Sequence, residues 1–438
     1  MSSDANLAPD VAEYVKSAIK VSKEWRLPDG RGDWRDAKAT IVKKAAVIGG
    51  GTMGRGIAIA CVLAGFETIL VEQNEEALSA CCKQLETTYT REMSLGRMSE
   101  QQRQRLNSPA FRKTTSFDGL AEVDLVIEAI FESMKLKKEL MARLDAICKP
   151  DCIIASNTSS LDFDEMSSPL KNPGRLVGMH FFNPANVIKV IEIVYGSHTS
   201  KEAVATAFAS TAAMGKLPIL VANCPSFMFN RLLHVYLTQA MKLTYLYGMY
   251  PKDIDRILAQ FGLQMGPMTM HDMNGIDVGA RIKSEHGMEL SSIERELIDR
   301  GRLGRKTGKG FYRYDSRGLK SDDPEVKAII DRISAGQNTQ QRHFAESDVI
   351  SFLLYPMVNE GYLCLEDGII ASPQLIDLMF HFGFGWPRRH GGPMRWAERY
   401  EGLQKIGETM RAAHSAEPEE LVYRLSDRLS SPLNSSKL

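Results

Sequence analysis

Short apolar runs alternate with a helical run near the start of the chain. Residues 45–48 are uninterrupted small and aliphatic side chains, which is typical of a buried parallel strand. Residues 53–64 have the length and apolar content of a helix that ends before Gly65, and residues 68–71 form a second apolar run. The pattern therefore predicts a strand–turn–helix–strand unit.

The same alternation continues to about residue 222. Further strands are expected at residues 124–128, 152–156, 175–179, 190–194 and 219–221, with a helix at residues 135–148. Residues 75–94 are a longer, charged helical run, which suggests a helical hairpin. Strands that alternate with helices predict an α/β fold of the Rossmann type with a doubly wound sheet.

After residue 223 the pattern becomes helical. Residues 227–247 form one long, largely apolar helical run that ends at Gly248. Four short motifs then recur in the same order: a leucine pair at 232–233 and 353–354, Pro…Ile-Asp at 251–255 and 373–377, Phe-Gly at 261–262 and 382–383, and Gly-Pro-Met at 266–268 and 392–394. This order predicts a duplicated all-α domain, because one helical unit with an exposed apolar face needs a second to cover it.

These patterns divide the chain into four parts. Residues 1–40 are an N-terminal extension and linker, and residues 41–222 form the Rossmann domain. Residues 223–345 form the first helical domain, and residues 346–438 form the second helical repeat with a C-terminal tail. Because the second copy can cover the apolar face of the first within one chain, we expect a monomer.

Composition and charge argue against several classes of function. The 438 residues carry 54 basic and 54 acidic side chains, and this balance does not favour nucleic-acid binding. No uncharged run reaches the length of a membrane span. The seven cysteines form no CxxC pair and no Cys/His metal spacing, so we expect free thiols and no metal site.

The last three residues, Ser436-Lys437-Leu438, match a known targeting signal. They form the SKL tripeptide that the peroxisomal import receptor reads. The alternative is an ordinary flexible tail. We expect the import receptor to be a partner and the peroxisome to be the location.

The glycine-rich turn after the first strand carries the clearest chemistry. Residues 49–54 fit GxGxxG, in which the first glycine makes the tight turn, the second lets the backbone approach a pyrophosphate, and the third allows close helix–strand contact. Glu72 ends the second strand, where a carboxylate accepts hydrogen bonds from the ribose and repels a 2′-phosphate. The unit predicts NAD rather than NADP, bound by Gly49, Gly51, Thr52, Met53, Gly54 and Glu72.

A histidine and a glutamate lie on neighbouring strand-like runs. His180 follows the run at 175–179, at the carboxyl edge of the expected sheet, and Glu192 lies in the run at 190–194. A carboxylate that fixes the tautomer of an imidazole and stabilises its protonated form makes a proton shuttle suited to an alcohol. By spacing alone, such a pair is more often structural.

Two short polar residues are candidates for holding a substrate oxygen. Ser159 lies in the stretch SNTSS, and Asn230 lies at the start of the long helix. By themselves, Ser159 is more typical of a helix N-cap, and Asn230 of a helix residue with its hydrogen bonds satisfied.

Seven motifs give the chain a resemblance to a known family: GGGTMGRGIAIA, EAIFE, SNTSSL, HFFNPANVIKVIE, NCPSFMFNR, GRLGRKTGKGFY and FGWPRRHGGPMRWA. From about residue 41 to its end, the chain resembles the 3-hydroxyacyl-CoA dehydrogenase family, in particular the dehydrogenase portion of the peroxisomal multifunctional enzyme of fatty-acid β-oxidation. The resemblance implies that His180 is the catalytic acid/base and that Glu192 orients it. It also implies that Ser159 and Asn230 hydrogen-bond the substrate oxygen.

The resemblance extends to residues that spacing alone does not single out. Glu132, Lys137, Asn183 and Lys306 fall where the family contacts the cofactor or the bound ligands, and Asn183 is expected to contact substrate as well. Without the resemblance, solvated surface charge is the more usual role for Glu132, Lys137 and Lys306. Ser226 departs from the family, which usually has glycine at this position.

The reaction that the resemblance implies is NAD-dependent oxidation of (3S)-3-hydroxyacyl-CoA to 3-oxoacyl-CoA in β-oxidation. Two alternatives remain: a 3-hydroxyacid dehydrogenase whose substrate lacks CoA, and a catalytically silent NAD-binding or scaffold protein. The presence of all four expected catalytic residues counts against the silent protein. Roughly forty residues precede the NAD-binding unit, too few for a hydratase/isomerase domain, so we expect no enoyl-CoA hydratase activity.

Overall fold

The computed structural model describes residues 7–24, 27, 34, 36–285, 289–337 and 344–430. The chain divides into two compact units. We call Ala12–Phe229 with Asp367–Gly383 the sheet unit, and Met1–Val11 with Asn230–Glu366 and Phe384–Leu438 the helical unit. The tail residues Ser436-Lys437-Leu438 lie outside the described residues.

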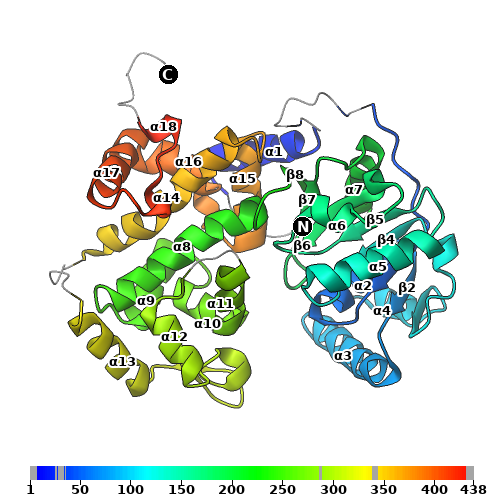
Figure 1. Ribbon diagram of the computed structural model, residues 1–438, viewed down its shortest axis with the longest axis horizontal. Helices are drawn as coiled ribbons and strands as arrows, with labels where there is room; N and C mark the ends of the chain where they lie inside the picture. Colours follow the sequence, from blue (N-terminus) through cyan, green and yellow to red (C-terminus); the bar gives the residue numbers. More distant parts are fainter. Residues whose placement is uncertain are drawn as a thin grey trace. The chain divides into compact units, whose positions relative to one another are not determined.

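An eight-stranded sheet forms the centre of the sheet unit (Figure 1). Its strands are β1 (Lys44–Ile48), β2 (Glu67–Val71), β3 (Phe111–Thr114), β4 (Leu125–Glu128), β5 (Ile153–Ser156), β6 (Leu176–Phe181), β7 (Val190–Tyr195) and β8 (Leu217–Ala222). The strand order is β3-β2-β1-β4-β5-β6-β7-β8. All neighbours are parallel except β6 and β7, which are antiparallel. The first six strands have the order of a doubly wound dinucleotide-binding sheet, which confirms the predicted Rossmann-type architecture.

Helices connect these strands. The sheet unit contains most of α1 (Pro9–Ser22), together with α2 (Thr52–Leu63), α3 (Glu75–Ser94), α4 (Glu100–Leu106), α5 (Met134–Ile147), α6 (Phe163–Ser167), α7 (Lys201–Ala213) and α15 (Pro373–Met379). α2 packs on β1 and β2, and α7 packs on β6, β7 and β8. The charged run at 75–94 is α3, and the shorter α4 follows it in the chain after a capping box at Ser99.

Among the elements of this unit that the sequence pattern missed are the edge strand β3 and the helix α7. β3 reads Phe-Arg-Lys-Thr, and only Phe111 of the four residues is buried, because the strand lies at the edge of the sheet. α7 reads Lys-Glu-Ala-Val-Ala-Thr-Ala-Phe-Ala-Ser-Thr-Ala-Ala, and small residues on nearly every side leave it without a clear apolar stripe. The central strands were easier to predict because β4, β5, β6 and β7 are buried along their whole length.

The helical unit continues α8 (Phe227–Tyr245) beyond Phe229. It contains α9 (Pro251–Phe261), α10 (Pro267–Asn274), α11 (Ile276–Glu285), α12 (Ser292–Asp299), α13 (Pro324–Ala335), α14 (Glu346–Glu366), α16 (Pro393–Trp396), α17 (Leu403–Ala416) and α18 (Asp427–Ser430). Two short strands, β9 (Arg313–Tyr314) and β10 (Lys320–Ser321), pair antiparallel. The prediction of an all-α domain is therefore corrected by one short hairpin.

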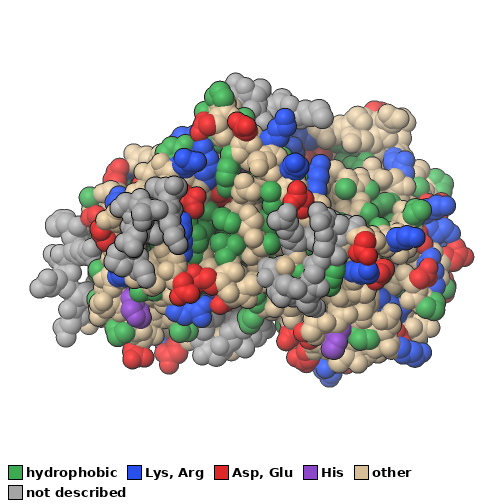
Figure 2. All heavy atoms as spheres, turned by 90° about the horizontal axis from the view of Figure 1, so that it is seen from above, with side chains coloured by type: hydrophobic (Ala, Val, Ile, Leu, Met, Phe, Trp, Pro, Cys, Tyr) green, Lys and Arg blue, Asp and Glu red, His purple; other side chains and the backbone are tan. Residues whose placement is uncertain are grey.

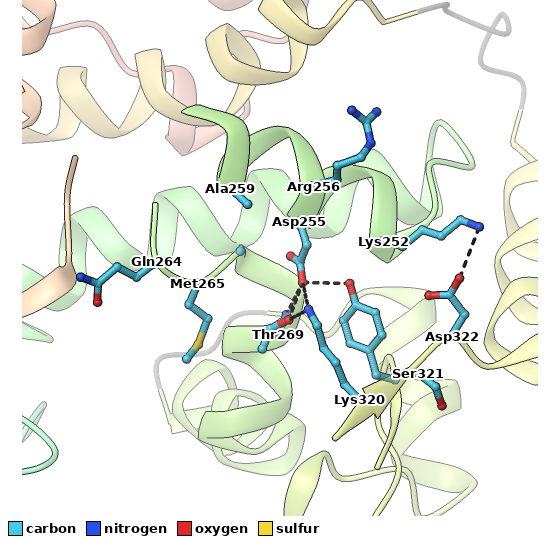
Figure 3. A pocket seen from close by; sticks show the side chains of 12 residues that line it. Lys252, Asp255, Arg256, Ala259, Gln264, Met265, Thr269, Lys320, Ser321 and Asp322 are labelled. Carbon is cyan, nitrogen blue, oxygen red and sulfur yellow. Dashed lines mark hydrogen bonds and ion pairs between the residues drawn. The ribbon is translucent and has the colours of Figure 1, made fainter. Parts of the chain in front are cut away.

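A buried carboxylate ties α9 to its neighbours in the helical unit (Figure 3). Asp255 accepts hydrogen bonds from the backbone N–H groups of Met268 and Thr269 at 2.9 and 3.0 Å, so it caps the N-terminus of α10 from a different helix. It also accepts from the Tyr312 hydroxyl at 2.8 Å and pairs with Lys320 at 3.3 Å. These contacts lie beside a cavity of about 450 Å³.

Surface charge, apolar helices, metal-binding groups and cysteines each bear on the class of function. Basic and acidic side chains are interspersed over the face shown in Figure 2. Among the described residues, no helix has the length and apolar character needed to cross a membrane. In the same part of the chain, no group of three or more His, Cys, Asp or Glu side chains is arranged to hold a metal ion. All seven cysteines are free thiols.

Candidate active site

The glycine-rich turn joins β1 to α2, and each of its glycines has a separate reason to lack a side chain. Gly49 has φ +97°, and a Cβ on it would lie 2.7 Å from the Ala129 carbonyl oxygen. A Cβ on Gly54 would lie 1.8 Å from the Gly49 carbonyl oxygen. The positions predicted for the tight turn and for close helix–strand contact are therefore the crowded ones.

Gly51 is different because the space beside it is open. No heavy atom of the described residues lies within 4 Å of where its Cβ would stand. It is the N-cap residue of α2, and no side chain caps that helix end. Open backbone at an uncapped helix N-terminus fits a pyrophosphate group, so the turn has the form that a dinucleotide needs.

Glu72 follows β2, and its carboxylate is held by backbone donors. Its Oε1 accepts from the Gly50 N–H at 2.7 Å, and its Oε2 accepts from the Gln73 N–H at 2.9 Å. A Cβ on Gly50 would lie 2.6 Å from Cys81 Sγ and 2.8 Å from Glu72 Oε1, so a side chain there would displace one or both of these groups. The carboxylate predicted to bind the ribose is thus fixed beside the glycine turn.

His180 and Glu192 lie directly opposite each other on the antiparallel strands β6 and β7. His180 Nδ1 and Glu192 Oε2 are 2.8 Å apart. Because a carboxylate only accepts, Nδ1 carries the proton and Nε2 is left as the base. Glu192 is fully buried, and its Oε1 accepts from the Phe229 N–H at 3.1 Å. The pair therefore has one defined tautomer and a fixed ring orientation.

Aromatic rings pack around the imidazole. The His180 ring centroid is 4.6 Å from that of Phe182 and 6.0 Å from that of Phe227. His180 is 7% exposed. The imidazole therefore lies in a largely apolar environment with little exposure to solvent.

The loop after β5 carries Ser159, which is half-buried. Asn157 Oδ1 accepts from the Phe181 N–H at 2.8 Å, which ties this loop to the residue after His180. The Ser159 N–H donates to Glu132 Oε1 at 3.0 Å, and the Thr158 hydroxyl donates to the same oxygen. The hydrogen bonds to Phe181 and to Glu132 therefore hold the loop at the carboxyl edge of the sheet.

Glu132 and Lys137 are not solvated surface charges. Lys137 is 1% exposed and lies 3.3 Å from Glu132 Oε2. Burial raises the pKa of the Glu132 carboxyl, but the Lys137 charge and the hydrogen bonds from Thr158 and Ser159 outweigh it, so the pKa lies below the usual value. Glu132 is therefore an anion at neutral pH, close to the Ser159 loop.

Two family models match consecutive parts of the chain. The 3-hydroxyacyl-CoA dehydrogenase NAD binding domain matches residues 44–224, and the 3-hydroxyacyl-CoA dehydrogenase C-terminal domain matches residues 227–314. A crystal structure of the dehydrogenase part of multifunctional enzyme 1 from C. elegans is 48% identical, with a TM-score of 0.71, and the match covers 96% of this chain and 97% of that one. The chain belongs to the 3-hydroxyacyl-CoA dehydrogenase family. The predicted NAD-binding domain is confirmed.

The chain is also similar to other members of the family. The peroxisomal bifunctional enzyme of Danio rerio is 36% identical over 452 residues, covering 96% of this chain and 61% of the relative. The 3-hydroxybutyryl-CoA dehydrogenase of Escherichia coli is 26% identical with a TM-score of 0.75, covering 89% of this chain and 98% of that one. The chain spans about three fifths of the length of the curated relatives that it matches.

The backbone conformation at Ser226 gives a reason for the glycine that the family usually has there. Ser226 has φ +65° and Phe227 has φ +54°, both in the left-handed region, at the turn between β8 and α8. A non-glycine residue there costs roughly 1–2 kcal/mol. The turn places the buried Phe227 ring near His180, so the departure lies next to the His180–Glu192 pair.

Three other predicted site residues lie outside the loop and strand ends described above. Asn183 is exposed on the turn after β6. Asn230 is the fourth residue of α8 and belongs to the helical unit. Lys306 also belongs to that unit, where it pairs with Asp277 at 2.6 Å. Their roles toward cofactor and substrate stay predictions.

Sequence reasoning missed Glu128, Asn157 and the Phe229 backbone N–H. Glu128 ends a predicted strand at the carboxyl edge of the sheet, which is the position where functional residues gather in such folds. That position was the available signal. Nothing local marks Asn157 or Phe229, because their partners are distant in the chain.

Proposed function

We propose that the dehydrogenase oxidises (3S)-3-hydroxyacyl-CoA to 3-oxoacyl-CoA with NAD, as one step of fatty-acid β-oxidation. The observation that carries this proposal is the hydrogen-bonded pair of His180 and the fully buried Glu192, in the unit that also holds the open glycine turn. The names of the relatives, which include 3-hydroxybutyryl-CoA dehydrogenase, support the substrate class.

The chemistry follows from the atoms of the pair. His180 Nε2 takes the proton of the 3-hydroxyl group, and Glu192 stabilises the imidazolium that forms. The glycine turn would hold NAD, which would supply the acceptor for the hydride from C3. Ser159 and Asn230 hydrogen-bond the oxygen as it becomes a carbonyl, and Asn183 contacts the substrate. Gly49, Gly51, Thr52, Met53, Gly54, Glu72, Glu132, Lys137 and Lys306 complete the cofactor site.

The deciding experiment is steady-state oxidation by the purified chain, followed by NADH absorbance. We expect turnover of 3-hydroxybutyryl-CoA with NAD, and no turnover of free 3-hydroxybutyrate. Turnover of the free acid at a comparable rate would favour the 3-hydroxyacid dehydrogenase without CoA. NAD binding without turnover of any acyl-CoA length would favour the silent protein.

We also propose that the helical region contains two copies of one unit, divided near residue 345, and that the chain is a monomer. Matching elements support this: α9 and α15 each begin with proline at the first helical position, and α10 and α16 each begin at a Gly-Pro pair. Asp255 and Asp377, which match in the repeat, are both buried. Ser351 stands at the position matching Asn230, so the second copy is structural.

For location, we propose the peroxisome. The support is the SKL tripeptide at the end of the chain and the naming of the relatives as peroxisomal enzymes. A fluorescent protein fused ahead of residue 1 is expected to enter peroxisomes, and removal of Ser436-Lys437-Leu438 is expected to leave it outside. Unchanged import after that removal would contradict the role of the tripeptide.

A further inference from the structure

Glu128 is a fully buried carboxylate at the end of β4. It accepts two contacts from the Lys137 ammonium, at 2.7 and 2.9 Å, and a hydrogen bond from the Ile130 N–H at 3.2 Å. The Ser156 hydroxyl donates to it as well. Both carboxylate oxygens of Glu128 therefore already accept contacts from protein groups, and neither is open to a ligand.

Two chains of contacts lead from Glu128 to the loop that carries Ser159. The first runs through Ser156, whose Oγ accepts from the Thr158 N–H at 3.1 Å. The second runs through Lys137 to Glu132, which accepts from the Ser159 N–H and the Thr158 hydroxyl. The loop is thus held by one network that begins at Glu128.

This network is not explained by stability alone. A buried ion pair is often no more stabilising than well-packed apolar residues of similar size, because both charges lose their hydration. An apolar pair at 128 and 137 would fill the space, but the Ser156 hydroxyl would lose its acceptor and Glu132 would lose its ion pair with Lys137. The charged network thus adds fixed contacts on both sides of residues 156–160 that an apolar pair would not supply.

We propose that Glu128 is a positioning residue of this dehydrogenase, which sets the Ser159 side chain against the reacting oxygen through Ser156 on one side and Lys137 and Glu132 on the other. The inference rests on the proposed function for its kinetic consequence, because Ser159 is the group that it places. Its structural consequence, the ordering of the loop backbone, does not depend on that function.

The kinetic test is a double-mutant cycle of Glu128→Gln and Ser159→Ala. Glu128→Gln alone is expected to lower kcat by about 10- to 100-fold, since misplacement by about 1 Å costs up to 10²-fold. In the Ser159→Ala background the same change is expected to cost less than about threefold, because the residue that it places is already gone. If the loss of kcat in the double mutant equals the product of the two single-mutant losses, Glu128 acts independently of Ser159 and the proposal is wrong.

Asp145→Asn is the matched control. Asp145 pairs with Arg175 at 2.9 Å, both side chains are nearly buried, and neither contacts the Ser159 loop among the described residues. This variant is expected to lower the melting temperature with kcat unchanged. Ser156→Ala breaks only the first chain of contacts, so it is expected to lower kcat less than Glu128→Gln does. It replaces Glu128→Gln in the test if the Glu128→Gln protein folds poorly.

Hydrogen exchange separates this inference from the proposed function. The amides of Thr158 and Ser159 are expected to be protected in the wild type, to exchange at least tenfold faster in Glu128→Gln, and to stay protected in Asp145→Asn. This readout needs no substrate. Unchanged protection in Glu128→Gln would refute the positioning role even in an active enzyme, whereas an inactive wild type with the expected exchange pattern would refute only the proposed reaction.

Discussion

At the residue scale, the proposed chemistry depends on the His180–Glu192 pair. Glu192 has two donors, the imidazole Nδ1 and the Phe229 N–H, and it is fully buried. A carboxylate in this position holds the ring and the tautomer at once. Loss of His180 would therefore remove the base itself, whereas loss of Glu192 would remove the group that orients it.

We expect His180→Gln to lower kcat by about 10²–10⁴-fold, because general-base help is typically of this size. NAD affinity should stay near that of the wild type, because the cofactor is held by the glycine turn. Glu192→Gln should be milder, since an amide oxygen can still accept from Phe229. Stopped-flow NADH formation and NAD titration measure the two effects, and wild-type kinetics in His180→Gln would remove the pair from the mechanism.

Cofactor choice is also decided at the residue scale. Glu72→Ala combined with Gln73→Arg should shift the preference toward NADP, because the repulsive carboxylate is replaced by a partner for a 2′-phosphate. NAD affinity should fall too, since the Gly50 N–H loses its acceptor. The ratio of kcat/KM for NAD and NADP is the measurement. A wild type that already prefers NADP would contradict the role given to Glu72.

At the element scale, helix ends are joined by side chains from other helices. Asp255 lies on α9 but caps α10, and it reaches the β9–β10 hairpin through Tyr312 and Lys320 (Figure 3). A cap supplied from a different element makes the two helices fold together. Loss of this carboxylate should therefore affect more than one helix.

We expect Asp255→Asn to destabilise the protein by about 1–3 kcal/mol, because buried donors lose a charged acceptor. Asp322→Asn is the control. Asp322 lies beside the same cavity, pairs with Lys252 at 3.3 Å, and is mostly exposed, so its loss should cost less than about 1 kcal/mol. Urea unfolding compares the two, and equal midpoints would show that the Asp255 contacts contribute little.

At the scale of the whole molecule, the helical unit contains a half-buried histidine, His271. Burial lowers the pKa of His271 to about 4, against the weaker opposing effects of Glu294 and the Leu237 carbonyl. The unfolded chain binds this proton near pH 6.5, so between about pH 6.5 and 4 the unfolded state holds more protons than the folded state. The contribution of His271 to stability must therefore fall as the pH is lowered through this range.

The expected loss is about 3 kcal/mol over that interval. His271→Gln should flatten the dependence, whereas His198→Gln, which changes an exposed histidine, should leave it unchanged. Denaturant unfolding of the full chain between pH 4 and pH 7 gives the three curves. The same slope in wild type and His271→Gln would mean that His271 does not titrate with a lowered pKa.

The proposed monomer is a second property of the whole molecule. α15 of the second copy belongs to the sheet unit, where the Ala222 N–H donates to Ile369 at 2.9 Å and the Phe229 and Phe380 rings are 5.2 Å apart. The second copy is thus part of the fold of both units. Light scattering of the full chain should give one chain per particle, and a dimer that persists on dilution into the nanomolar range would contradict internal pairing of the repeat.

The sequence by itself determined the elements whose cause is local. The apolar runs of β1 and β4–β8, the glycine turn and the long α8 follow from short-range periodicity and from the backbone freedom of glycine, and the structure has them within a few residues of the predicted bounds. The edge strand β3 and the small-residue helix α7 were missed, because neither has a clear apolar period.

Only the tertiary structure decided which charged groups meet. The antiparallel pairing of β6 and β7 sets His180 opposite Glu192, and the neighbouring ends of β4 and β5 bring Ser156 to Glu128. Lys137 is buried, although its helix reads as charged, because two carboxylates from the preceding strand and loop face it. Such contacts depend on the path of the chain between distant residues, and no local pattern of hydrophobic and polar positions encodes that path.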